Sequence, residues 1–118
     1  MKYVVAGYSQ KILVDKKLDI IDAEILRWFI DFYFTGKMTK VIDKKTNFEY
    51  VWVKYQAIID DLPILGITNK QVIARRFKKM VDAGILKSYL HKKNGVYSCF
   101  QINEDEYNTL IEYKKDEK

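Results

Sequence analysis

One segment, residues 67 to 102, constrains the fold more than any other part of the chain. In it a basic amphipathic stretch is followed by two alternating runs around a turn. Within the basic stretch, ITNKQVIARRFKKMVDAGIL, apolar residues recur at spacings of three and four, which predicts a helix with one buried face. The buried face is expected to consist of Ile73, Phe77, Met80 and Val81.

Both ends of this predicted helix carry a signal. Thr68 is followed three residues later by Gln71, the pattern of a capping box, so we expect the helix to cover about residues 69–83. Gly84 then supplies the left-handed backbone conformation that commonly closes a helix.

The runs ILKSYLH and VYSCFQI alternate between apolar and polar residues and are joined by KKNG. Asn94-Gly95 favours a type I′ turn, which requires positive φ at both central positions. The sequence therefore predicts a β-hairpin over residues 86–102 with a basic tip.

The remaining elements are predicted by the same rules of periodicity and turn chemistry. We expect a strand within KYVVAGY, a mostly buried helix at 20–35 capped by Asp19, a hairpin at 38–53, a short helix at 55–61 ended by Pro63, and a helix at 104–113. The prediction is one α+β domain, residues 1–118, with a disordered tail at about 114–118.

Charge is unevenly distributed along the chain. Residues 68–95 hold eight Lys or Arg and one acidic residue, whereas the rest of the chain has 13 basic and 15 acidic residues. A basic block on a slightly acidic body is typical of a protein that binds a polyanion such as nucleic acid. A solvated face that only keeps the domain soluble is the alternative.

A helix, a tight apolar turn, a second helix and a β-hairpin, in that order, form the winged helix-turn-helix arrangement. The second helix of such proteins enters the major groove of duplex DNA with its N-terminal residues near the base edges. We therefore expect a winged helix-turn-helix with an extra N-terminal strand, an additional β-hairpin and a C-terminal helix. The expected DNA contacts are Thr68, Asn69, Lys70, Gln71, Arg75, Arg76, Lys78 and Lys79 in the helix, and Lys92, Lys93 and Asn94 in the wing.

The chemistry of five of these side chains suggests what each would contact on DNA. Asn69 and Gln71 have the amide groups that pair with adenine, and Arg75 has the two-pronged donor for guanine. Lys78 and Lys79 suit phosphate contact, which positions a protein without reading sequence. Arg75 and Lys79 are both expected to project from the core. Phosphates would then offset the repulsion among the crowded cations of this helix.

These residues also resemble a known family. The segments VWVKYQAIIDDLPILGITNKQVIARRFKKMVDAGIL and GVYSCFQI, with YVVAGYSQKILVDKKLDIIDAEILRWFIDF upstream, resemble winged-helix proteins of phages and mobile elements of Gram-positive bacteria. Such proteins are described as phage replication initiators or replisome-organiser-like N-terminal domains. The resemblance implies DNA binding near a replication origin. Many of these proteins continue into a further C-terminal region, so the chain is either a stand-alone domain or part of a longer protein.

An enzyme is the rival from another class, and we do not expect one. The single histidine, His91, ends a predicted strand beside Lys92, and Cys99 alternates within a strand as a buried thiol would. No metal-ligand spacing and no glycine-rich phosphate loop are present, so no metal or cofactor is expected. One cysteine and the lack of a signal-peptide pattern favour a cytoplasmic protein without a membrane segment.

Two functions remain as alternatives to replication initiation: a transcriptional regulator of the same fold, and a winged-helix adaptor that binds protein rather than DNA. Replication proteins and a second copy of the chain are additional candidate partners. The seam of a homodimer would be the first long helix, if Trp28, Phe32 or Tyr33 were left exposed. The alternative hypothesis is a monomer in which this helix forms part of the core.

Overall fold

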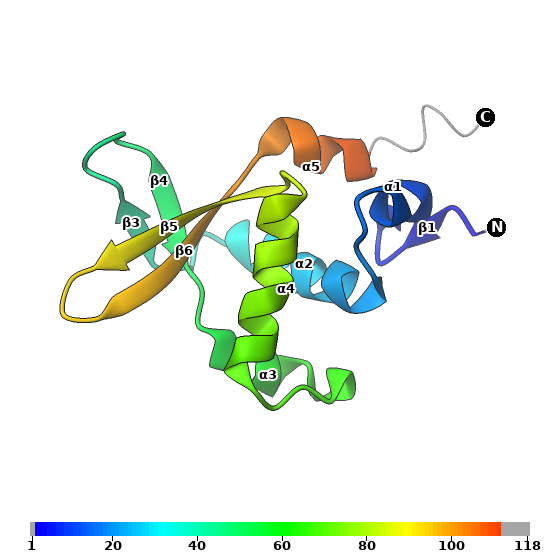
Figure 1. The fold of residues 1–118 in the computed structure, drawn as a ribbon, viewed down its shortest axis with the longest axis horizontal. Coiled ribbons are helices and arrows are strands. Elements are labelled where there is room, and N and C mark those ends of the chain that lie inside the picture. Colours follow the sequence, from blue (N-terminus) through cyan, green and yellow to red (C-terminus); the bar gives the residue numbers. More distant parts are fainter. Residues whose placement is uncertain (1, 112–118) are drawn as a thin grey trace.

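The computed structural model describes residues 2–111, and within that range the chain forms an α+β fold with five α-helices and two antiparallel sheets (Figure 1). The expected disordered tail at 114–118 lies outside the described residues. The helices are α1 (Gln10–Asp15), α2 (Ile20–Tyr33), α3 (Tyr55–Asp61), the 3-10 turn η1 (Pro63–Leu65), α4 (Lys70–Asp82) and α5 (Glu104–Ile111). The strands are β1 (Val4–Val5), β2 (Tyr8–Ser9), β3 (Lys40–Ile42), β4 (Glu49–Trp52), β5 (Leu86–Lys92) and β6 (Val96–Ile102).

The two hairpins predicted from sequence are present and share one sheet of strand order β3-β4-β6-β5. Strands β5 and β6 pair along their whole length, from Leu86 opposite Ile102 to Lys92 opposite Val96. Strand β4 joins the hairpins by pairing with β6 (Figure 1). This pairing was not predicted, because residues about 50 positions apart carry no sign of it in a single sequence.

The N-terminal segment differs from the prediction of one strand. It folds back as a two-stranded hairpin, β1 and β2, and continues directly into α1, which was not predicted. The turn residues Ala6 and Gly7 both have positive φ, 54° and 83°. An alanine rarely adopts this conformation, so Ala6 carries no turn signal in the sequence. The Arg27 Nε donates a hydrogen bond to the Ala6 carbonyl (3.1 Å), and its guanidinium lies 4.5 Å from the centre of the Tyr8 ring, tying the hairpin to α2.

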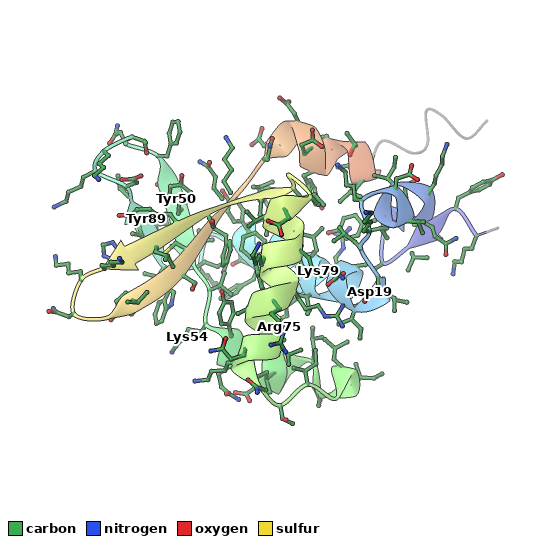
Figure 2. The ribbon with its side chains drawn as sticks, in the orientation of Figure 1. Asp19, Tyr50, Lys54, Arg75, Lys79 and Tyr89 are labelled. Carbon is green, nitrogen blue, oxygen red and sulfur yellow. The ribbon has the colours of Figure 1, made fainter. Side chains whose placement is uncertain are left out.

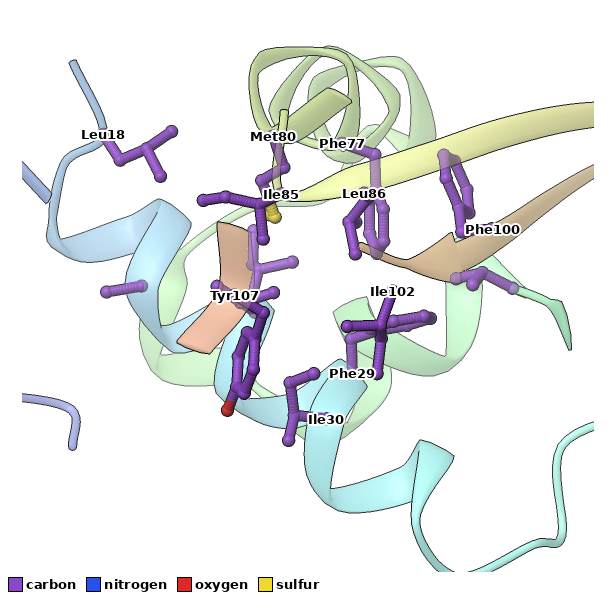
Figure 3. Close-up of a cluster of buried hydrophobic side chains, with 14 of the residues drawn as sticks. Leu18, Phe29, Ile30, Phe77, Met80, Ile85, Leu86, Phe100, Ile102 and Tyr107 are labelled. Carbon is purple, nitrogen blue, oxygen red and sulfur yellow. The ribbon is translucent and has the colours of Figure 1, made fainter. Parts of the chain in front are cut away.

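The core lies between α2, α4, α5 and one face of the sheet (Figure 3). Phe77 of α4 is at its centre, with ring centroids 5.9 Å from Phe29 of α2 and 4.7 Å from Phe100 of β6. Ile73 and Met80 are fully buried beside it, as predicted, and Val81 is partly buried. Burial of this stripe fixes which face of α4 meets solvent.

Helix α2 does not leave the aromatic seam on which the homodimer hypothesis depended. Trp28, Phe32 and Tyr33 are half-buried and pack against the core. The Trp28 indole also donates a 2.7 Å hydrogen bond to Asp61 of α3. The ring that α2 leaves in solvent is Phe34 at its C-terminal end, 72% exposed. Self-association remains a prediction.

Candidate nucleic-acid interface

Helix α4 begins one residue later than its sequence signal indicated. The N-cap is Asn69, whose side-chain oxygen accepts a 2.8 Å hydrogen bond from the Gln71 backbone N–H. The capping box predicted from Thr68 is therefore wrong. The helix starts at Lys70, so the N-cap position belongs to Asn69, and Thr68 lies one residue too early to cap it. The cap also engages the oxygen that Asn69 would need for a two-pronged contact with adenine. Gln71, which is exposed, is the predicted amide contact of this turn that does not serve as the cap.

The C-terminal end of α4 follows the prediction. Gly84 has a φ of 83°, the Gly84 N–H donates to the Val81 carbonyl, and the Ile85 N–H donates to the Met80 carbonyl. These two bonds are a Schellman motif, which satisfies carbonyls at the helix end and turns the chain into β5.

The exposed face of α4 is a stripe of polar residues opposite the core. Gln71, Arg75, Lys78 and Asp82 are all exposed, in agreement with the prediction from helical geometry. Lys70 in the first turn is exposed beside them. Figure 2 shows Arg75 on α4 near its α3 end.

Two cations of α4 contact carboxylates at the N-terminal end of α2. Arg76 donates to Asp19 and, at 3.2 Å, to Asp22, and Lys79 also donates to Asp22. Asp22 is fully buried, and its backbone and side chain form a capping box with Asp19 at the start of α2. The charge of Asp22 is thus compensated by two basic groups and one backbone N–H.

This arrangement corrects the expectation that phosphates relieve the repulsion within the helix. Carboxylates at the start of α2 already pair with Arg76 and Lys79, so neither cation is free, and the Lys79 side chain, 40% exposed, lies against Asp22 instead of projecting wholly into solvent. Burial alone would raise the pKa of Asp19, but hydrogen bonds from the Asp22 N–H and the Arg76 guanidinium outweigh it and lower that pKa to about 2. The sequence could not show this, because Asp22 lies 54 positions from Arg76 and 57 positions from Lys79.

The other cations of α4 differ in whether a carboxylate pairs with them. Lys78 forms a pair with Asp82 at 2.9 Å, on the same helix, with both side chains mostly exposed. Such a pair contributes little to stability and opens easily. Lys70 and Arg75 form no ion pair with any described residue. The helix therefore presents two free cations and one pair that opens easily.

The tip of the β5–β6 hairpin is basic, as predicted, but its turn differs. Lys92 pairs with Val96, so the loop has three residues, Lys93 to Gly95, rather than the two of a type I′ turn. Asn94 and Gly95 both have positive φ, 56° and 139°. The three predicted contacts of the tip, Lys92, Lys93 and Asn94, are exposed, and within the described range neither lysine has a carboxylate partner.

The structure adds a residue that the sequence prediction missed. Lys54, directly before α3, is exposed, and its ammonium lies 5.4 Å from the centre of the Trp52 ring. A pocket of about 240 Å³ connects Lys54 and Gln56 with Lys70 of α4 and with Val96 and Ser98 of β6. The starts of both helices and the β5–β6 hairpin therefore adjoin one depression. The position of Lys54 at the start of the first helix of the predicted helix-turn-helix was the available signal, since in proteins of that type this helix crosses the DNA backbone.

The single cysteine and the single histidine of the chain lie apart from any cluster of acidic side chains in the described residues. Cys99 is fully buried, and burial raises the pKa of its thiol. His91 lies on β5 between Tyr89 and Tyr97. Among residues 2–111, no three His, Cys, Asp or Glu side chains form a cluster suited to a metal ion.

Comparisons of the chain with protein-family models, with curated proteins and with solved structures gave no match. The resemblance to phage replication proteins therefore remains a prediction from the residues. None of the helices in the described part of the chain is long and apolar enough to cross a membrane.

Proposed function

We propose that the chain is a winged helix-turn-helix protein that binds double-stranded DNA. In this proposal α3, η1 and α4 form the helix-turn-helix, with α4 as the recognition helix, and the β5–β6 hairpin is the wing. The observation that carries the proposal is the set of exposed basic side chains at the 240 Å³ pocket, on the outer face of α4 and at the hairpin tip that have no carboxylate partner among the described residues. They are Lys54, Lys70, Arg75, Lys92 and Lys93.

The roles follow from position. Gln71 and Arg75 are exposed on the face of α4 away from the core, where a helix in the major groove meets base edges. Lys54 and Lys70 flank the start of α4 and suit phosphates on one side of the groove. The hairpin tip would contact the backbone or the minor groove further along the duplex. Arg76 and Lys79 serve the fold by holding α4 on α2.

A role in replication initiation of a phage or mobile element is part of the proposal and rests on the family resemblance alone. It makes a replication origin the expected target. A transcriptional regulator with the same interface would bind an operator in the same way. Selection of bound sequences from a random duplex pool would identify the target.

Salt-dependent binding to a labelled duplex of random sequence tests the proposal. If the five free cations each neutralise one phosphate, log K falls against log[salt] with a slope of about −4.5. Affinity then drops roughly 500-fold between 50 and 200 mM salt. Fluorescence anisotropy measures both quantities.

A matched pair of double variants locates the interface. Lys70→Gln with Lys93→Gln should reduce the slope by about 1.8. Lys2→Gln with Lys11→Gln removes the same charge at exposed positions near the N-terminus and should leave the slope close to the wild-type value. No duplex binding at low salt, or equal slopes for the two variants, would favour the protein adaptor instead.

A further inference from the structure

The outer face of the four-stranded sheet carries a second set of aromatic side chains that duplex binding leaves unexplained. Because side chains alternate along each strand, Val51 and Phe100 point into the core while their neighbours Trp52 and Cys99 point away from it. Tyr50 is buried and yet is not part of the main core. These residues form a separate layer on the outer face.

Five rings on this face form an unbroken series. Trp52 packs edge-on against Tyr97 with ring centroids 5.1 Å apart, Tyr97 is 6.1 Å from His91, and His91 is 6.1 Å from Tyr89. Tyr89 stacks on Tyr50 at 5.2 Å with an interplanar angle of 28°. Figure 2 shows these last two side chains between the β3–β4 hairpin and β5. Apart from the buried Tyr50, the rings are half-exposed.

A groove of about 650 Å³ runs beside the rings, between the β3–β4 turn and β5. Lys44 and Lys45 line it from the turn, and Lys92 and Lys93 from the other side. None of these four lysines has an ion-pair partner within residues 2–111. Asp43 is the one carboxylate among the described residues that line the groove. It accepts hydrogen bonds from the Lys45 backbone N–H and the Thr46 hydroxyl, so it stabilises the turn.

We propose that this outer face binds single-stranded DNA, with bases against the half-exposed rings and phosphates against the four lysines. Half-exposed rings next to unpaired cations are the combination that single-stranded nucleic acid requires, since every base has a face for stacking and every linkage a charge. A duplex hides the faces of its bases, so it cannot use the rings. The proposal goes beyond the proposed function, and only its choice of DNA over RNA rests on that function.

Fluorescence anisotropy with labelled dT12, rU12 and a duplex tests the inference. Four lysine contacts predict a salt slope of about −2.8 for dT12. Lys44→Gln with Lys45→Gln should reduce that slope by about 1.4. Both residues are exposed in a turn held by other groups, so the fold is preserved, and neither belongs to the proposed duplex interface.

A second pair of variants tests the rings. His91→Ala should weaken dT12 binding at least about five-fold, the lower end of a stacking contribution, while His91→Phe restores it. Both variants and the lysine variant should bind the duplex within about two-fold of wild type. Arg75→Ala should do the reverse, losing duplex affinity and keeping dT12 affinity.

Several results would overturn the inference: no dT12 binding at 50 mM salt, wild-type dT12 affinity in both the lysine variant and His91→Ala, or loss of dT12 binding in Arg75→Ala. Tighter binding of rU12 than dT12 would overturn the choice of DNA. Displacement of dT12 by polyglutamate of equal charge as readily as by unlabelled dT12 would show that stacking is not involved. Double-stranded DNA binding is measured separately, in the duplex titration, so its absence would not be mistaken for absence of dT12 binding.

Discussion

Arg75 and Arg76 are adjacent in sequence but lie in different surroundings, so alanine at each position gives a matched comparison. Arg75 is exposed on α4 and forms no ion pair with a described residue. Arg76 donates to Asp19 and to the fully buried Asp22. We expect Arg75→Ala to weaken DNA binding at unchanged stability, and Arg76→Ala to lower stability.

The magnitude for Arg76→Ala follows from its two bonds. A hydrogen bond to a charged group contributes about 1.5–3 kcal/mol, and the bond to Asp19 is worth less because half of that side chain is exposed. Asp22 keeps Lys79 and the Asp19 N–H, so the loss is smaller than the roughly 3–5 kcal/mol of a fully broken buried pair. We expect about 2–3 kcal/mol. For a chain of this length that is roughly 8–12 °C in Tm.

For Arg75→Ala the stability change should stay within about 0.5 kcal/mol, as is usual on a surface. A two-pronged contact with guanine would make the loss of affinity about 1–3 kcal/mol at its base pair. The salt slope should also fall by about 1.

Thermal unfolding followed by circular dichroism, together with anisotropy on a duplex, measures both effects. The comparison is made below the Tm of the weaker variant so that both are folded. Equal Tm values for Arg75→Ala and Arg76→Ala would refute the assignment of Arg76 to the fold. Wild-type duplex affinity in Arg75→Ala at every sequence tested would refute the role of Arg75.

Three further predictions concern the fold that supports the interface. Because folding lowers the pKa of Asp19 from 3.8 to about 2, the ionised carboxylate stabilises the folded protein fully above pH 3.8, and this stabilisation is lost as pH falls toward about 2. The free energy of unfolding of Asp19→Asn should therefore fall less steeply with pH over that range than that of wild type in an acid titration. Asn69→Ala should cost about 1 kcal/mol in urea unfolding because it removes the cap of α4, whereas Thr68→Ala should change stability by less than about 0.5 kcal/mol; the opposite order would restore Thr68 as the cap. Phe77→Ala should cost about 3–5 kcal/mol because its ring is fully buried between Phe29 and Phe100, and a cost near 1 kcal/mol would mean that the core is not packed as described.

Local patterns predicted the local structure well. The alternation of ILKSYLH and VYSCFQI predicted β5 and β6, and Pro63 marked the end of a helix whose bounds, Tyr55 to Asp61, match the prediction. The apolar spacing of α4 predicted both its buried stripe and its exposed one. Each of these features depends on residues within a few positions of one another.

What the sequence could not predict depends on long-range contacts or on unusual backbone. The pairing of Arg76 and Lys79 with Asp22 joins residues 54 and 57 positions apart and decides which cations are free. The Ala6-Gly7 turn requires an alanine at positive φ. The choice between Thr68 and Asn69 as cap depends on a single residue of register, to which sequence patterns are least sensitive. Of the predicted contacts, Arg76 and Lys79 are thus held by carboxylates of α2, whereas the location of the site stays a prediction.

Backbone amide NMR of the labelled protein, titrated with a short duplex, shows whether DNA binds at α4 and the β5–β6 hairpin. We expect chemical-shift changes that saturate with the duplex and concentrate at Lys54, at residues 69–75 and at the hairpin tip, residues 92–95. The surface of α5 and the N-terminal hairpin should change little. No shift changes at saturating duplex, or changes centred on α5 and the N-terminal hairpin, would contradict this expectation.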